Sequence, residues 1–152
     1  MPETIENMVG EGRSKTPWHI WVVGIIATLW NSGGVLDYVM TKTRNEAYLS
    51  SFTPEQLEYF YGFPIWANAA WAFGVWGAFI GSLLILARSR YAFAAFIVSL
   101  LGLIGSTIYQ VTSHMPSSLN TPGIWAFNAL IWASVLLLIW YTRKMTGKGI
   151  LH

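Results

Sequence analysis

Five strongly polar side chains lie inside stretches of sequence that are otherwise apolar. One is a carboxylate and four are amides: Asp37, Asn31, Asn68, Gln110 and Asn128. In lipid such groups are costly unless they face a protein interior and find hydrogen-bond partners. Two interpretations follow: the groups line a polar ligand-binding pocket, or they form hydrogen bonds that hold helices together. Asp37 is the strongest ligand-binding candidate because it is the only ionisable acid in these stretches.

Four tryptophans lie deeper in the same apolar stretches: Trp30, Trp71, Trp76 and Trp132. Indole rings at this depth either fill the protein interior or form an aromatic surface on which a ligand can stack. We take Trp30 and Trp76 as the stacking candidates beside the five polar groups. An aromatic surface with amides and one carboxylate above it suits sugars, quinones and other amphiphiles equally well.

Several kinds of chemistry are disfavoured by residue content. The chain has no cysteine, which excludes thiolate catalysis, iron–sulfur clusters and cysteine zinc sites. The histidines, His19, His114 and His152, are not spaced to ligate a haem or a metal ion. The nine basic residues form no stripe that could follow a nucleic-acid backbone. We therefore predict no cofactor, no metal, no catalytic residue and no nucleic-acid partner.

Four elements of membrane-spanning length must position these side chains. The chain is 54% hydrophobic and 11% charged, against about a quarter charged in an ordinary soluble domain. Four stretches reach the roughly twenty apolar residues that cross the hydrocarbon: Trp18 to Met40, Pro64 to Ala87, Tyr91 to Thr112 and Gly123 to Thr142. We predict an all-α fold, a four-helix bundle integral to the lipid bilayer, with residues 1–152 as one domain.

The orientation follows from the lysines and arginines, because short loops rich in them stay cytoplasmic. Seven lie on one side: Arg13, Lys15, Arg88, Arg90, Arg143, Lys144 and Lys148. Lys42 and Arg44 lie on the other. Both termini are therefore expected in the cytoplasm, with residues 1–16 as a flexible tail rather than a removable signal peptide. At 1.5 Å per residue, the five polar groups lie about 3 to 14 Å below the outer boundary, all in the outer half.

The first outer loop contains a helix-start signal. Thr53, Pro54 and Gln56 form a capping box with proline at the first helical position. Leu57 and Phe60 recur at helical spacing after it. We predict a short amphipathic helix at the outer membrane interface, where it either anchors the loop or covers the mouth of the bundle.

Stripes of small residues predict how the helices pack, because membrane helices associate where backbones can approach closely. The second span has Ala70, Gly74, Gly77 and Gly81 on one face, and the third has Ala95, Ser99, Gly102 and Ser106. We expect these stripes to contact each other across a tight hairpin. In the first span Trp30, Gly33, Gly34 and Asp37 share a face, which combines a packing surface with a charge.

Several segments resemble a family of small four-span bacterial membrane proteins that often carry the label "sugar transporter". The resemblance lies in residues 18–21 (WHIW), 29–41 (LWNSGGVLDYVMT), 44–48 (RNEAY), 63–64, 75–77, 87–90 (ARSR) and 119–123 (LNTPG). It covers nearly the whole chain after Thr16. The resemblance implies a four-helix protein of the bacterial inner membrane, and it assigns no role to any residue.

Three functional hypotheses follow from the residues. The first is a membrane protein that binds, or helps to move, a small polar or amphiphilic molecule at an outward-facing pocket. The second is an accessory or assembly subunit of a larger inner-membrane complex, or a homo-oligomer. The third, an enzyme with Asp37 as base and Tyr38 or Tyr109 as acid, is disfavoured because a solvated carboxylate is a weak base at neutral pH.

Overall fold

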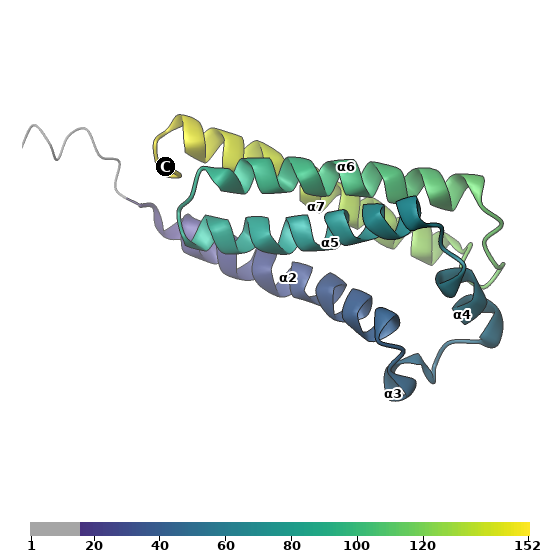
Figure 1. The fold of residues 1–152 in the computed structure, drawn as a ribbon. Coiled ribbons are helices and arrows are strands. Elements are labelled where there is room, and N and C mark those ends of the chain that lie inside the picture. The colour runs from purple at the N-terminus through teal and green to yellow at the C-terminus, as the bar shows by residue number, and fades with distance from the viewer. Residues whose placement is uncertain (1–15) are drawn as a thin grey trace, which may run out of the picture.

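The computed structural model describes residues 16–152, which contain six helices and no β-strand (Figure 1). The helices are α2 (Trp18–Lys42), α3 (Glu46–Leu49), α4 (Pro54–Tyr61), α5 (Ile65–Leu86), α6 (Tyr91–Thr112) and α7 (Pro122–Gly147). The cytoplasmic tail predicted at the N-terminus, with Arg13 and Lys15, lies outside the described residues apart from Thr16. We call the end of the bundle that carries the α5–α6 loop and the C-terminus the inner end, after the predicted orientation. The outer end is the one that carries α3, α4 and the α6–α7 loop.

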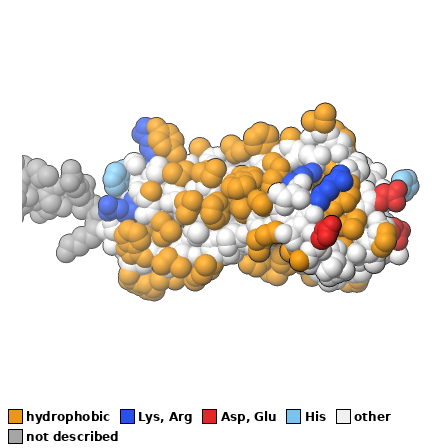
Figure 2. All heavy atoms as spheres, turned by 60° about the horizontal axis from the view of Figure 1, so that its bottom comes forward, with side chains coloured by type: hydrophobic (Ala, Val, Ile, Leu, Met, Phe, Trp, Pro, Cys, Tyr) orange, Lys and Arg blue, Asp and Glu red, His pale blue; other side chains and the backbone are white. Residues whose placement is uncertain are grey.

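Within the described part of the chain, α2, α5, α6 and α7 are long and apolar enough to cross a membrane. This confirms the predicted fold, a multi-pass membrane protein built as a four-helix bundle. On the face shown in Figure 2, hydrophobic side chains cover the length of the bundle and acidic side chains gather at one end. The last span is longer than predicted: α7 continues beyond Thr142 to Gly147, because Arg, Lys and Met favour a helix even where it leaves the apolar layer.

The small-residue stripes of α5 and α6 pack on each other as predicted. A Cβ added at Gly77 would lie 2.9 Å from the Ser99 backbone nitrogen, so these backbones are in direct contact. The Ser99 hydroxyl also donates a 2.7 Å hydrogen bond to the Gly74 carbonyl. Lipid tails are as apolar as the helix side chains, so the hydrophobic effect does not hold membrane helices together. Close backbone approach of this kind supplies much of their attraction instead.

The stripe predicted on α2 is not a packing surface at Gly33. A Cβ added there would meet nothing within 4 Å, whereas one added at Gly24 would lie 2.5 Å from the Leu86 side chain. The close approach of α2 to α5 is therefore near the inner end. Figure 1 shows α2 diverging from α5 toward the outer end, which agrees with the open space at Gly33, whereas a Cβ at Gly34 would still lie 3.8 Å from the Val75 side chain.

The hydrophobic core occupies the inner half of the bundle. Buried members come from all four spanning helices and the C-terminal segment: Ile20, Ala27, Ala78, Ile85, Ala92, Phe96, Leu138, Met145, Ile150 and Leu151. In the outer halves of the spanning helices only Thr41, Ala67 and Gly102 are buried. Most buried residues thus lie in the inner half, whereas in the outer half close packing is confined to the contact between α5 and α6 at Gly74 and Gly102.

The C-terminal segment closes the inner end. Gly149 has a φ of 74°, and after it the Ile150 amide donates to the Met145 carbonyl at 3.0 Å. This is a Schellman helix end, in which glycine adopts the left-handed conformation at little cost. The turn sends Ile150 and Leu151 back under the bundle, and the His152 amide donates to the Arg88 carbonyl at 3.0 Å.

The outer loop forms the predicted amphipathic helix. In α4 both hydrogen bonds of the capping box are present: the Gln56 amide donates to the Thr53 hydroxyl, and the Thr53 amide donates to the Gln56 side chain. The helix is fixed to the α6–α7 side of the bundle by hydrogen bonds of Tyr59 with Ser113, at 2.7 Å, and of Gln56 with Ser118, at 3.0 Å. The segment therefore lies across the outer end of the bundle.

Candidate functional site

Asp37 is held by the outer loop. The Tyr48 hydroxyl donates a 2.5 Å hydrogen bond to the Asp37 carboxylate, and both side chains are half-buried. Burial, together with the hydrogen bond to Asp37 and its negative charge, raises the pKa of Tyr48 to about 12. Tyr48 is therefore a protonated hydrogen-bond donor at neutral pH, and it fixes the orientation of the only carboxylate in the spanning helices.

A cation lies five residues after Asp37, at the end of the same helix. The Lys42 ammonium donates to the Asn68 side-chain oxygen and lies 5.4 Å from the centre of the Trp71 ring. Trp71 in turn contacts Tyr38 edge to face, with ring centres 5.0 Å apart. The outer ends of α2 and α5 are therefore joined by a cation, an amide and two aromatic rings. We call Asp37, Tyr38, Lys42, Tyr48, Asn68 and Trp71 the outer cluster.

A run of aromatic contacts connects the outer cluster to the outer loop. The ring centres are 6.0 Å apart for Tyr48 and Phe52, 5.9 Å for Phe52 and Phe60, 6.1 Å for Phe60 and Phe63, and 5.9 Å for Phe63 and Trp71. With the Asp37–Tyr48 hydrogen bond, this run ties α3 and α4 to both helices of the cluster. Edge-to-face and tilted ring pairs contribute directional packing energy beyond their buried area. The loop therefore positions the cluster.

The other three polar candidates lie outside the outer cluster. Asn31 donates to the Ser82 hydroxyl at 2.9 Å and so joins α2 to α5 nearer the middle of the bundle. Asn128 donates to the Gln110 side-chain oxygen at 3.2 Å and joins α7 to α6. These contacts match the interpretation in which amides hold helices together. The five polar residues of the sequence prediction thus fall into four separate sets of contacts, and only Gln110 and Asn128 contact each other directly.

The deep tryptophans are distributed in the same way. Trp30 donates to the Ser134 hydroxyl at 3.2 Å across the gap between α2 and α7, and 41% of it is exposed. Trp132 donates to Thr107 at 3.1 Å between α7 and α6. Trp76 contacts Tyr38, with ring centres 6.5 Å apart, and so borders the outer cluster. Of the two stacking candidates, Trp76 therefore contacts Tyr38, a member of the outer cluster, whereas Trp30 lies between α2 and α7.

Four members of the outer cluster were not among the predicted ligand-binding residues: Tyr38, Lys42, Tyr48 and Trp71. A signal for three of them is present in the sequence. Tyr38 and Lys42 are four residues apart, and Asn68 and Trp71 are three apart, so each pair shares a helix face. The prediction ended the first span at Met40 and so left Lys42 in a loop. Tyr48 has no such signal, because its contact with Asp37 depends on how the outer loop folds back.

The outer cluster presents one carboxylate, one ammonium, an amide and aromatic rings at one end of α2 and α5 and on the loop between them, on half-buried or exposed side chains. These groups can form hydrogen bonds and ring contacts with a ligand. In comparisons with protein-family models, curated proteins and solved structures, the chain matches none.

Proposed function

We propose that this protein binds a small polar or amphiphilic molecule at the outer end of its bundle, through the outer cluster. The observation that supports this proposal is that two polar contacts lie at the same end of the bundle: Lys42 binds Asn68 beside the Trp71 and Tyr38 rings, and Asp37 is held by Tyr48. Aromatic rings flanked by hydrogen-bonding groups are the usual composition of a small-molecule site.

The charges of the cluster narrow the class of ligand. Asp37 and Lys42 carry opposite charges, so the cluster as a whole is close to neutral. A ligand with a large net charge would be attracted by one of these groups and repelled by the other. We therefore expect a neutral polyhydroxylated molecule or a zwitterion, whose polar atoms replace the Tyr48 and Asn68 hydrogen bonds. A sugar belongs to this class, in agreement with the label carried by the family that the sequence resembles.

We also propose that the outer end faces away from the cytoplasm, in a bacterial inner membrane. Among residues 16–152, Arg88, Arg90, Arg143, Lys144 and Lys148 lie at the inner end. The outer end has Lys42 and Arg44. Under the positive-inside rule this bias places the inner end in the cytoplasm. The closely packed core and the C-terminal segment would then separate the outer cluster from the cytoplasm, so movement of a ligand across the membrane would require a rearrangement.

A thermal-shift screen tests the proposal. The purified chain in neutral detergent is heated with a panel of neutral mono- and disaccharides and zwitterionic amino acids. We expect at least one compound to raise the unfolding temperature of the wild type, because ligands that bind the folded state stabilise it. Asp37→Asn keeps the side-chain shape and should abolish the shift. Asn128→Ala, a polar change in the same layer but outside the cluster, should retain it. A shift that survives in Asp37→Asn argues against the site.

A second candidate, an accessory subunit of a larger membrane complex, is supported by the position of α7. This helix packs closely only on α6, and it reaches α2 mainly through the side-chain hydrogen bonds of Trp30 with Ser134 and His19 with Tyr141. Of the four spanning helices it has the smallest buried share. Extraction in a mild detergent, followed by size analysis, tests this candidate: a defined hetero-complex supports it, and a lone monomer argues against it.

A further inference from the structure

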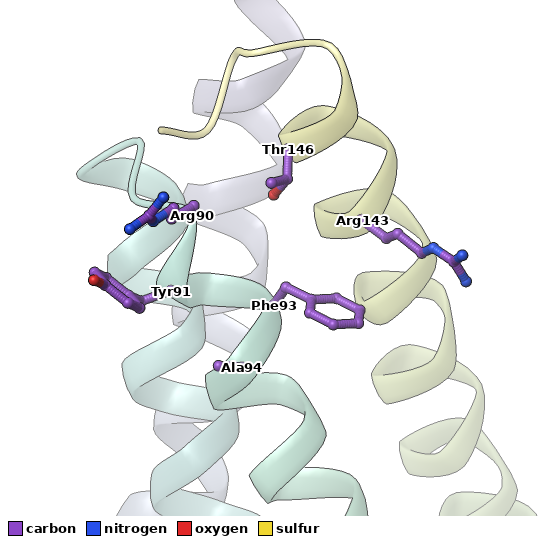
Figure 3. Close-up of a pocket in the computed structure, with 6 residues that line it drawn as sticks. All are labelled: Arg90, Tyr91, Phe93, Ala94, Arg143 and Thr146. Atoms are coloured by element: carbon purple, nitrogen blue, oxygen red, sulfur yellow. The ribbon is translucent and has the colours of Figure 1, made fainter.

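A groove of about 620 Å³ lies at the inner end of the bundle, where α6 begins and α7 ends. Its lining residues are Arg90, Tyr91, Phe93 and Ala94 from the α6 side and Arg143 and Thr146 from α7. Figure 3 shows Phe93 and Thr146 pointing toward the space between the two helices. Arg90 and Arg143 flank this space with their guanidinium groups turned outward.

The frame of this groove is held by the C-terminal segment. Ile150 and Leu151 are buried in the core, and the backbone of His152 pairs with the α5–α6 loop. The His152 amide donates to Arg88, and the Arg90 amide donates to the His152 carbonyl at 3.4 Å. The start of α6 and the end of α7 are therefore linked across the end of the groove, so the two arginines are kept on opposite sides of it.

The charge around the groove is positive. Arg90 and Arg143 line it, and an adjoining groove of about 400 Å³ is lined by Trp140, Arg143, Lys144 and Gly147. Within the described part of the chain, the acidic side chains all lie between residues 37 and 58, at the opposite end. An anion placed between the two arginines would therefore meet cations and no carboxylate side chain of residues 16–152.

Apart from Thr146 and the Tyr91 hydroxyl, the remaining lining is apolar. Phe93 and Ala94 belong to the first turn of a helix long and apolar enough to cross a membrane, so acyl chains would begin near them. Lys144 lies 4.9 Å from the centre of the Trp140 ring, and Arg90 lies 5.3 Å from that of Tyr91. Basic and aromatic side chains together are typical of the headgroup level of a membrane. The groove thus combines a cationic rim with an apolar floor.

We propose that this groove binds an anionic phospholipid. Its phosphate accepts hydrogen bonds from Arg90 and Arg143, and one acyl chain lies over Phe93 and Ala94 between α6 and α7. Guanidinium groups bind phosphate oxygens through paired, charge-assisted hydrogen bonds, and both side chains are exposed and can turn toward the groove. Basic pockets between spanning helices are a known way of holding anionic headgroups. This proposal does not depend on the function of the outer cluster.

Lipid titration of the whole purified chain tests the proposal. Native mass spectrometry measures the binding of phosphatidylglycerol and of phosphatidylcholine with the same acyl chains. We expect the wild type to bind phosphatidylglycerol more tightly, and Arg90→Gln/Arg143→Gln to weaken that binding by about 30-fold, as expected for two cations at a membrane surface. Arg44→Gln/Arg88→Gln removes the same charge outside the groove and should bind phosphatidylglycerol as the wild type does.

Two further measurements distinguish a bound lipid from a bound phosphate ion and from a general effect of charge. Ala94→Leu fills the apolar floor without a change of charge and should weaken phosphatidylglycerol binding, and it remains informative if the double arginine variant fails to fold. Water-soluble glycerol phosphate at the same concentration should not displace the lipid. Equal affinities for the two lipids, equal losses in the two double variants, or full displacement by glycerol phosphate would each overturn the proposal.

Discussion

Gly102 lies where the backbones of α5 and α6 touch, and its replacement by alanine should destabilise the bundle. The added Cβ would lie 2.5 Å from the Ala70 carbonyl oxygen and 2.9 Å from the Gly74 Cα, and it would also overlap the Gly74 nitrogen. Backbone atoms cannot turn aside as a flexible side chain can, so the helices must separate by about 1 Å to reach ordinary contact distance.

The magnitude follows from three contributions. Overpacking of a close contact costs about 1 to 3 kcal/mol. Separation of the helices also stretches the hydrogen bond from Ser99 to the Gly74 carbonyl, and bonds between membrane helices contribute about 0.6 kcal/mol on average. Part of this loss is offset, because alanine stabilises a helix by about 0.5 to 1 kcal/mol relative to glycine. We expect Gly102→Ala to lose about 1 to 3 kcal/mol of unfolding free energy.

Gly33→Ala is the matched control. Nothing lies within 4 Å of an added Cβ at Gly33, so only the helix preference remains, and this variant should gain up to about 1 kcal/mol. Reversible unfolding in mixed micelles, followed by far-UV circular dichroism, measures both values. The reasoning fails if Gly102→Ala unfolds as the wild type does, or if the two variants change stability in the same direction.

Three other changes probe separate parts of the molecule. Leu151→Ala removes a side chain that is 1% exposed and should cost about 2 to 4 kcal/mol in the same unfolding assay; an unchanged stability would show that the C-terminal segment does not close the inner end. Thr53→Ala removes half of the capping box and should cost α4 about 1 kcal/mol, seen as faster amide hydrogen exchange confined to residues 54–61. Tyr48→Phe tests the pKa of Tyr48, which is raised to about 12. An unfolded tyrosine ionises near pH 10, so this raised pKa stabilises the fold below pH 10 and the stabilisation is lost between about pH 10 and 12. The wild type should therefore lose more stability over that range than Tyr48→Phe, and parallel pH profiles would contradict the assignment.

The helical fold was predictable because its signals are local or periodic. Apolar runs of spanning length predict the four long helices, and the Thr53 capping box predicts the start of α4. The contact between α5 and α6 was predictable because a short loop makes them neighbours and both carry stripes of small residues. Gly33 shows where this reasoning fails: a small residue permits close approach, but whether another helix approaches depends on how the whole bundle diverges.

The types of residue in the site were predictable from the sequence, but their hydrogen-bond partners were not. Polar groups within apolar stretches marked Asp37 and Asn68, and both belong to the outer cluster. Helical spacing does not predict the hydrogen bond of Asn128 with Gln110 or that of Tyr48 with Asp37, because those partners are brought together by loops and by neighbouring helices. The helix end at Gly149 was predictable from the sequence as well, because glycine followed by an apolar residue such as Ile150 is a pattern of a Schellman helix end.

The accessibility of Asn68 from the outer side tests the proposed ligand site most directly. Because the chain has no cysteine, Asn68→Cys introduces a single reactive thiol, and Ser89→Cys in the α5–α6 loop is the control at the inner end. In intact cells, a membrane-impermeant maleimide should label Asn68→Cys and not Ser89→Cys, and a compound that stabilises the wild type should slow the labelling. Labelling of Ser89→Cys alone, or labelling of Asn68→Cys at a rate that no such compound changes, would contradict the proposed site.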